Sequence, residues 1–216
     1  MTGGDDTDRG EPDGSNPWTI RSADLRYENP WIRVVHHEVL NPAGSPGIYG
    51  VVRFRNRAVG VVPVDRDGHT WLVGQYRFPL DRYSWEIPEG GAPEGQSPAD
   101  AANRELAEET GLTARHLMEI GLADLSNSVS DETGFLYVAW DLTAGVADPE
   151  ETERLSLRRL PLREALAMAM DGRITDSLSQ IALMKLRLMA DRAHGAADGA
   201  ADLPDELRRA LRAGFA

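Results

Sequence analysis

The sequence has 216 residues, of which 41% are hydrophobic, so the chain can bury the core of one large domain or of a domain with a small addition. Its 35 acidic and 23 basic residues give a formal net charge of −12, which disfavours binding to nucleic acids and to anionic membranes. It has no cysteine, which excludes disulfides, thiolate metal sites and cysteine nucleophiles.

The N-terminal segment is acidic and rich in glycine. It reads MTGGDDTDRGEPDG and has neither the basic start nor the apolar stretch of a secretion signal, so we expect a cytoplasmic protein. No apolar run in the chain reaches the ~18 residues that a membrane-spanning helix needs, so no membrane span is expected. Residues 1–16 have almost nothing apolar to bury, which predicts a disordered tail before a fold that begins near Trp18.

The first half of the folded chain is predicted to be mostly β-structure. Valine-rich runs separated by turn signals predict strands over residues 31–40, 48–54, 58–64 and 70–76. A further short strand is expected around Trp85, and Pro88 with the two glycines that follow it should end that strand.

A helix over residues 98–110 is the clearest element of the second half. Ser97 is a good N-cap, Pro98 suits the first helical position, and Asp100 stands three residues after the cap, the spacing of a capping box. Gly111 stands where a left-handed C-cap belongs. Further strands are expected at 117–125, 135–142 and 154–160, and further helices at 162–170, 177–190 and 204–212.

Three glutamates share one side of the last turns of this helix. Glu105, Glu108 and Glu109 lie three and four residues apart, where like charges repel by about 0.2–0.5 kcal/mol per pair. A helix C-terminus also prefers cations. A hard divalent ion such as Mg²⁺ or Mn²⁺ would turn this repulsion into coordination. A solvated acidic face would show the same spacing, and the three glutamates alone leave both interpretations open.

The segment around this helix carries a longer pattern. Residues 90–112, GGAPEGQSPADAANRELAEETGL, resemble the Nudix box of the Nudix hydrolases. The positions in register are Gly90, Arg104, Glu105, Leu106, Glu108, Glu109, Gly111 and Leu112. One position departs from the pattern, because Gln96 stands where the box has its first glutamate. The resemblance implies an α+β fold, a Nudix α/β/α sandwich with a mixed sheet and an N-terminal antiparallel β extension.

The resemblance also implies roles for the box residues. Glu105 and Glu109 would ligate the metal, which is Mg²⁺ with Mn²⁺ as the alternative. Glu108 would be a further ligand or lie close to one. Glu108, Glu109 and Arg104 would serve catalysis, with Arg104 orienting the carboxylates. Gln96 can accept a hydrogen bond from Arg104 but brings no charge to a metal cluster. The chain is then either an enzyme with a changed metal requirement or a catalytically silent relative.

Residues before the box narrow the subfamily. Gln75-Tyr76-Arg77 followed by Trp85-Glu86-Ile87-Pro88 resembles the ADP-ribose pyrophosphatases and related nucleoside-diphosphate-sugar hydrolases. In that case Arg77 and Glu86 would help to hold the diphosphate and its metal, and the planar fork of an arginine suits two phosphate oxygens. A surface ion pair for Arg77 and an exposed strand-edge carboxylate for Glu86 are the alternatives.

The polar stretch at 125–132 leads into a predicted strand and is a candidate catalytic loop. The same subfamily resemblance implies a loop glutamate here that activates water or binds metal. Glu132 is the candidate, and the adjacent Asp131 is close enough to take that role instead.

The implied reaction is metal-assisted attack of water on a diphosphate bond, with ADP-ribose giving AMP and ribose 5-phosphate. Hydrolysis of nucleoside triphosphates or dinucleoside polyphosphates is the second interpretation, and a silent nucleotide sensor is the third. The expected divisions are a tail (1–16), an N-terminal β region (17–57), a Nudix domain (58–193), and a linker with a small C-terminal helix (194–216). The β region resembles the dimerisation region of the pyrophosphatases, so a homodimer that binds a small nucleotide derivative is expected.

Overall fold

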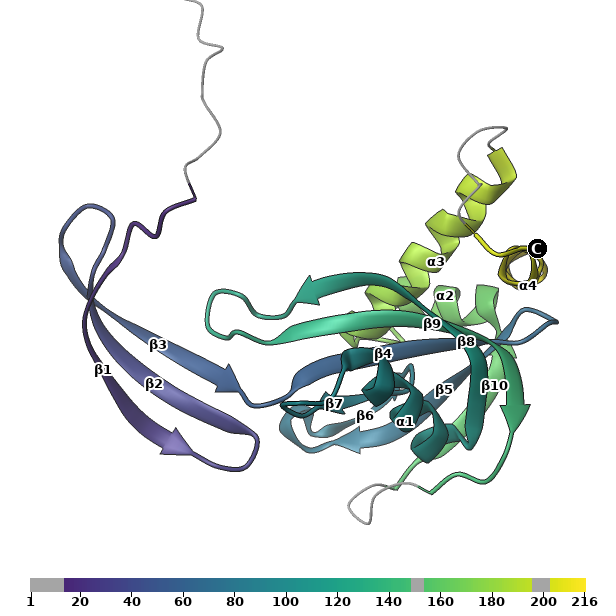
Figure 1. Ribbon diagram of the computed structural model, residues 1–216, viewed down its shortest axis with the longest axis horizontal. Helices are drawn as coiled ribbons and strands as arrows, with labels where there is room; N and C mark the ends of the chain where they lie inside the picture. Colours follow the sequence, from purple (N-terminus) through teal and green to yellow (C-terminus); the bar gives the residue numbers. More distant parts are fainter. Residues whose placement is uncertain (1–13, 149–153, 196–202) are drawn as a thin grey trace, which may run out of the picture. The chain divides into compact units, whose positions relative to one another are not determined.

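The computed structural model describes residues 14–148, 154–195 and 203–216 (Figure 1). The chain divides into two compact units, Met1–Arg53 and Phe54–Ala216. The tail predicted over 1–16 falls mostly on residues 1–13, and the predicted linker falls mostly on 196–202. Both of these segments lie outside the described residues.

The first unit contains a three-stranded sheet in the order β1-β2-β3. Its strands are β1 (Thr19–Glu28), β2 (Ile32–Leu40) and β3 (Pro46–Phe54), of which β2 and β3 were predicted. β1 was not predicted, because its ten residues TIRSADLRYE show no clean alternation of apolar and polar side chains, and all of them are exposed. It forms a strand because it pairs antiparallel with β2, across two register shifts.

The second unit is an α/β/α sandwich, as the resemblance implied. A four-stranded mixed sheet, β7-β4-β9-β8, lies beside a three-stranded antiparallel sheet, β10-β5-β6. Among the described strand pairs of this unit, β4–β9 is parallel and the others are antiparallel. The strands are β4 (Arg57–Val64), β5 (His69–Arg77), β6 (Arg82–Glu86), β7 (Glu89–Ala92), β8 (Leu112–Asp124), β9 (Thr133–Ala144) and β10 (Ser156–Pro161).

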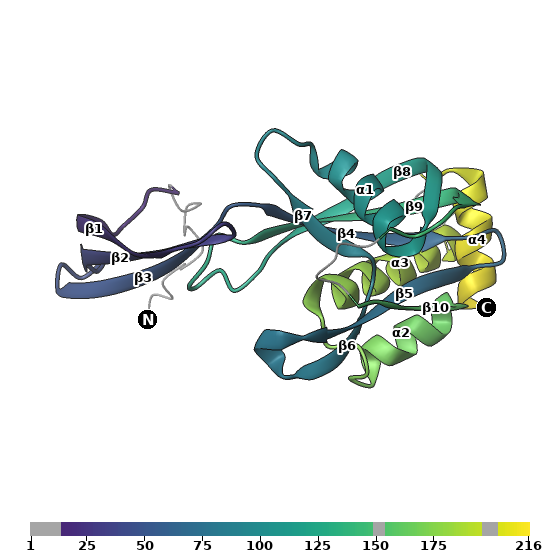
Figure 2. The ribbon, with the colours of Figure 1, turned by 90° about the horizontal axis from the view of Figure 1, so that it is seen from below.

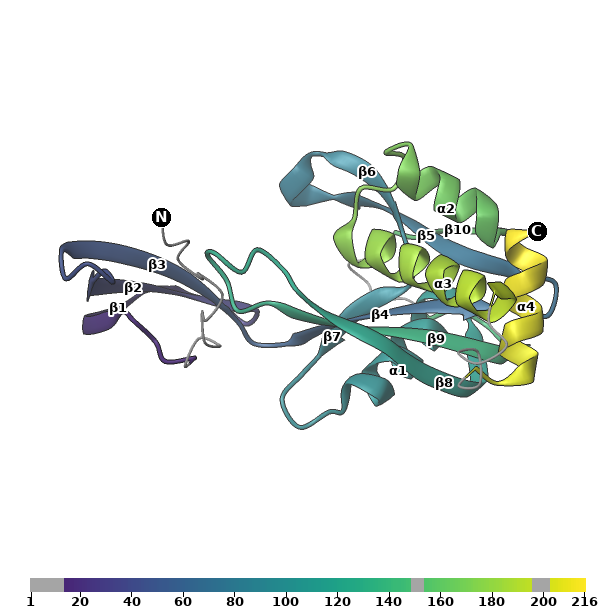
Figure 3. The same cartoon turned by 90° about the horizontal axis from the view of Figure 1, so that it is seen from above.

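Helices cover both faces of the mixed sheet, as Figures 2 and 3 show from opposite sides. They are α1 (Pro98–Thr110), α2 (Leu162–Met170), α3 (Ser177–Gly195) and α4 (Asp205–Phe215). Val59 and Val61 of β4 pack in the cluster that contains Leu106 of α1. Val62 and Val64 of the same strand pack in the cluster formed with the other three helices. This division between two faces follows from the alternation of side chains along a strand.

The predicted bounds of α1 are confirmed together with their causes. The hydroxyl of Ser97 accepts a hydrogen bond from the backbone N–H of Asp100 at 3.1 Å. At the other end Gly111 has φ +72°, and its N–H donates to the carbonyl of Ala107. A Cβ at Gly111 would also lie 2.7 Å from the backbone nitrogen of Ala147, so both conformation and space require glycine there.

The strand around Trp85 ends before Pro88 as predicted, since β6 stops at Glu86. A further strand that was not predicted follows it. Glu89–Ala92 forms β7, an edge strand antiparallel to β4, with Val59 opposite Gly90. Backbone pairing with β4 overrides the low strand propensity of glycine. The consequence for the site is that β7 runs beside α1 and turns backbone N–H groups toward it.

The C-terminal helix α4 belongs to the core of the second unit. Leu207 and Leu211 are completely buried in the large hydrophobic cluster. Gly214 lies against Gly68, since a Cβ on Gly214 would be 2.4 Å from the Gly68 carbonyl oxygen. Among the described residues, no helix is both long and apolar enough to cross a membrane.

Candidate functional site

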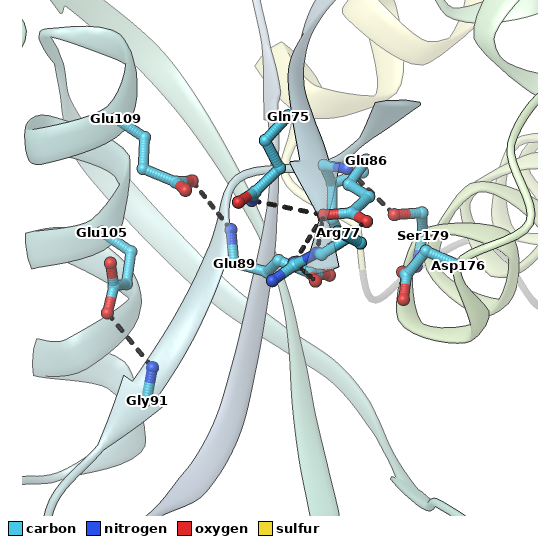
Figure 4. A network of polar contacts seen from close by, with 10 residues as sticks. Gln75, Arg77, Glu86, Glu89, Gly91, Glu105, Glu109, Asp176 and Ser179 are labelled. Atoms are coloured by element: carbon cyan, nitrogen blue, oxygen red, sulfur yellow. Dashed lines mark hydrogen bonds and ion pairs between the residues drawn. The ribbon is translucent and has the colours of Figure 1, made fainter. Parts of the chain in front are cut away.

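Two of the box glutamates are buried and point from α1 toward β7 (Figure 4). Glu109 is 2% exposed and accepts a hydrogen bond from the backbone N–H of Glu89 at 3.0 Å. Glu105 is 8% exposed and accepts one from the backbone N–H of Gly91 at 3.2 Å. A Cβ on Gly90 would lie 2.1 Å from a carboxylate oxygen of Glu105, so the strand comes this close only because position 90 is glycine.

The electrostatics of this pair favour a cation. Burial raises the pKa of Glu105, although Arg104 beside it acts in the opposite direction. Both glutamates also lie in the last turns of α1, where the helix dipole is negative. Carboxylate oxygens are the ligands that Mg²⁺ prefers, so the donor type fits a hard divalent ion. In the described part of the chain, no three histidine or acidic side chains already converge on one such position.

Arg104 ties α1 to β7. Its Nη1 group donates to Glu108 at 2.6 Å, and its Nη2 group donates to the carbonyl of Gly91 at 2.8 Å and to Glu105 at 2.9 Å. Arg104 is thus paired with both Glu105 and Glu108. Glu108 differs from the other two box glutamates in being only half-buried. This network fixes the orientation of Glu105 relative to the strand.

Gln96 takes no part in that network. Its main-chain carbonyl accepts a hydrogen bond from Arg57 at 3.0 Å. Within the residues that the structure describes, its side chain accepts no hydrogen bond from Arg104, although the sequence left that bond open. The orientation of Arg104 is therefore left to Gly91, Glu105 and Glu108.

Arg77 is held by two carboxylates on the other side of β7 (Figure 4). Its Nε group donates to both oxygens of Glu86 at 3.0 Å, and its Nη2 group donates to Glu89 at 2.6 Å. The Glu86 side chain is 3% exposed, so it is a buried partner and no exposed edge carboxylate. Burial acts to lower the pKa of Arg77, but Glu86 and Glu89 outweigh it, and the pKa lies above its ordinary value.

A cavity of about 490 Å³ adjoins this ion-pair network. Its lining includes Arg77, Glu86, Glu89, Glu132 and Asp176. The structure therefore brings Glu132 to the same cavity as the predicted diphosphate-binding pair. Glu105 and Glu109 are not part of this lining.

Glu89 connects the two groups of residues. Its backbone N–H donates to Glu109, whereas its carboxylate accepts from Arg77. Burial raises the pKa of Glu89 well above its ordinary value, the neighbouring Asp176 and Glu86 raise it further, and Arg77 acts against them. Glu89 was not among the predicted site residues, because its proximity to Glu109 depends on β7, which was not predicted.

The structure distinguishes the two acids of the candidate loop. Asp131 accepts a hydrogen bond from the backbone N–H of Phe54 at 2.9 Å, so its carboxylate is committed to holding the loop. Glu132 lines the cavity, and burial together with the charge of Asp176 raises its pKa. Of the two, Glu132 has the position from which a group in the cavity can be reached.

Asp176 was also missed by sequence analysis. It lies just before α3 and accepts a hydrogen bond from the backbone N–H of Ser179 at 2.7 Å, the geometry of an N-cap. The sequence signal that could have found it is an aspartate followed by Ser177 at the start of a predicted helix. Nothing in the sequence, however, indicates that this cap faces Glu89 and Glu132.

Comparisons with known proteins agree on one family. Residues 54–178 match the NUDIX domain, and residues 18–52 match the nucleoside diphosphate sugar hydrolase N-terminal domain. The chain is 32% identical over 133 residues to an ADP-ribose pyrophosphatase of Bacillus subtilis, which covers 61% of this chain and 72% of that protein. It is 35% identical over 155 residues to a methanol dehydrogenase activator of Bacillus methanolicus, with 71% and 83% covered.

Two further comparisons concern hydrolases of ADP compounds. The ADP compounds hydrolase NudE of Escherichia coli is 28% identical over 174 residues, 80% of this chain and 86% of that protein. A crystal structure of an ADP compounds hydrolase superposes with a TM-score of 0.70 at 24% identity, covering 82% of this chain and 96% of the other. The latter likeness supports the fold of the second unit.

The buried carboxylates predict a stability effect of Glu105→Gln in metal-free buffer. Because the folded pKa of Glu105 is raised, its contribution to stability is fully present below the unfolded value of about 4.3 and is lost as pH rises through the folded pKa. At pH 7 the glutamine variant should therefore have the higher Tm, by about 2–4 °C for each kcal/mol regained. Mg²⁺ should raise the Tm of the unchanged chain more than that of the variant.

The exposed loop residue Glu94 offers the matched control, since Glu94→Gln removes the same charge without changing a buried group. Thermal unfolding of the three proteins with and without Mg²⁺ makes the comparison. Equal Tm values and equal responses to Mg²⁺ for all three would contradict the assignment of Glu105.

Proposed function

Since this chain belongs to the Nudix hydrolase family, we propose that it hydrolyses the diphosphate bond of a nucleoside-diphosphate derivative, with ADP-ribose as the leading substrate. The products would be AMP and ribose 5-phosphate. The observation that carries this proposal is the position of Arg77, whose guanidinium is bonded by the carboxylates of Glu86 and Glu89 beside a cavity. Strand β7 lies between this arginine and the buried box glutamates of α1 (Figure 4). Relatives named for ADP-ribose and ADP compounds support the choice of substrate.

Glu105 and Glu109 are the proposed ligands of the divalent metal, with Glu108 as an additional ligand and Mg²⁺ favoured over Mn²⁺. When bound, the metal would supply positive charge to the diphosphate and help to activate water. The protein's own contribution is rigidity, because each buried carboxylate is fixed by a backbone N–H of β7. Arg104 would hold Glu105 and Glu108 in place while the substrate binds.

Arg77 is the proposed diphosphate ligand. Glu86 and Glu89 occupy its Nε and Nη2 groups, and within the described residues its Nη1 group donates to no protein acceptor. The two carboxylates therefore orient the guanidinium through its Nε and Nη2 groups, and its Nη1 group can donate to a phosphate oxygen. A pre-oriented arginine loses less conformational entropy on binding than a mobile one.

Glu132 is the proposed general base, which takes a proton from the attacking water. A base acts best when its pKa lies near the working pH, and burial moves the pKa of Glu132 in that direction. The net charge of −12 supports a small-molecule substrate rather than a nucleic acid.

The first test is turnover. With Mg²⁺, the protein should convert ADP-ribose to AMP and ribose 5-phosphate faster than it converts nucleoside triphosphates or dinucleoside polyphosphates, as product chromatography would measure. Glu109→Gln should lower kcat/KM by about 100-fold or more, because a charge placed to stabilise the transition state is lost. Glu94→Gln is again the control.

Three results would contradict parts of this proposal. Unchanged turnover in Glu109→Gln would remove the site assignment. A preference for triphosphates would replace the substrate. Binding of ADP-ribose without turnover would favour a silent nucleotide sensor, and recovery of activity in Gln96→Glu would trace that silence to the departure in the box.

The assignment of Glu132 predicts a pH dependence. For the unchanged chain, kcat/KM should fall as pH falls through the raised pKa of Glu132, because the protonated carboxyl is no longer a base. Glu132→Gln should lower the rate and flatten this acid limb. Asp131→Asn keeps an oxygen that can accept from Phe54, so it should retain the limb. Loss of the limb in Asp131→Asn alone would transfer the role to Asp131.

We also propose that the chain is a homodimer through its first unit. Among the described residues of that unit, Val39 is the one buried apolar side chain. Ile20, Leu25, Tyr27 and Ile48 are more than half exposed, and Trp31 is 66% exposed. A three-stranded sheet with so little core needs a further surface to cover its apolar side chains.

Light scattering at micromolar concentration should therefore give the mass of a dimer. Trp31→Glu should shift the equilibrium toward monomer, because it would bury a charge in the interface. Leu188→Glu, at an exposed apolar position of α3 in the second unit, should leave the dimer intact. A monomeric unchanged chain would contradict the proposal.

A further inference from the structure

We propose that Ser179 is a positioning residue for Arg77 and acts through the main chain of Ile87. This inference rests on the proposed function, because it concerns how the diphosphate-binding arginine is oriented. Figure 4 shows Ser179 in the first turn of α3 and Asp176 just before that helix, next to the segment that carries Glu86.

The contact itself is a buried hydrogen bond between distant parts of the chain. The hydroxyl of Ser179 accepts from the backbone N–H of Ile87 at 2.9 Å, across 92 positions of sequence. Both residues are fully buried. Water is therefore kept away from the N–H of Ile87, and the Ser179 hydroxyl accepts the hydrogen bond that a carbonyl of a neighbouring strand would otherwise accept.

Ile87 needs such a partner because it lies between two strands. The β5–β6 pairing ends at Glu86, and the β4–β7 pairing begins at Glu89. The backbone N–H of Ile87 thus has no ladder partner within these pairings. The Ser179 hydroxyl fixes the peptide at the point where the chain passes from one sheet to the other.

This fixed peptide separates the two carboxylates that grip Arg77. Glu86 precedes Ile87 directly, and Glu89 follows two residues after it. Because both carboxylates bond the same guanidinium, a shift of the peptide between them changes the angle at which Arg77 is held. Displacement of a substrate-binding group by about 1 Å can weaken its action by about 100-fold.

Asp176 holds Ser179 in turn. Its carboxylate accepts from the backbone N–H of Ser179 at 2.7 Å and lines the same cavity as Arg77. The first turn of α3 is therefore fixed at its cap, and the serine hydroxyl is presented to Ile87 from a rigid element. Asp176 is thus connected through Ser179 and Ile87 to Glu86 and Glu89, whose carboxylates bond Arg77.

The test compares Ser179→Ala with a control that also removes a buried hydroxyl. In Thr70→Val the lost hydroxyl has no hydrogen-bond partner among the described residues, and position 70 lies at the opposite end of β5 from Arg77. With Mg²⁺ and ADP-ribose, Ser179→Ala should raise KM by about tenfold with kcat within about twofold, because Arg77 binds the diphosphate in both ground and transition states. Thr70→Val should leave both parameters unchanged.

A double variant separates positioning from simple stabilisation. Arg77→Gln alone should also raise KM, and Ser179→Ala added to it should have no further effect, because the hydroxyl acts only through the arginine. If Ser179→Ala does not fold, Ser179→Cys keeps a side chain of similar size with a weaker acceptor and should raise KM in the same direction.

The outcomes distinguish this inference from the proposed function. No turnover of ADP-ribose by the unchanged chain would refute the function itself. Turnover by the unchanged chain with a normal KM for Ser179→Ala and only a lower Tm would show a structural hydrogen bond and overturn the positioning role. Full additivity of Ser179→Ala and Arg77→Gln would overturn it as well.

Discussion

Two carboxylates removed from water, at the negative end of a helix, are the arrangement on which the rest of this site depends. Glu105 and Glu109 stand in the last turns of α1, where neither the helix dipole nor their mutual charge favours them. Burying a carboxylate is unfavourable unless it is paired and hydrogen-bonded. The protein supplies backbone N–H groups from β7 and the guanidinium of Arg104, and a divalent cation would supply the remaining compensation.

This requirement explains the form of the strand beside the helix. β7 has glycine at position 90, where any side chain would collide with Glu105, and it presents the N–H groups of residues 89 and 91 to the two carboxylates. The same strand carries the Glu89 side chain to Arg77. The proposed metal ligands and the proposed diphosphate ligand are therefore joined through one residue, and a movement of β7 would change both.

Sequence patterns sufficed where the cause of a structure is local. The helix over 98–110 was predicted to the residue because Ser97, Pro98 and Gly111 act within one turn of its ends. β1 and β7 escaped prediction because each becomes a strand through a partner elsewhere in the chain. The candidate site residues divide in the same way. The box glutamates and Arg77 were proposed from their motifs. Glu89 and Asp176 were not proposed, because only the folded sheet and the start of α3 bring them to the cavity.

Diffraction from crystals soaked in Mn²⁺ tests the central claim most directly, because anomalous scattering locates this ion independently of any activity. The account predicts a peak within about 2–2.5 Å of carboxylate oxygens of both Glu105 and Glu109. The absence of a peak there, with both carboxylates in the positions described above, would contradict it.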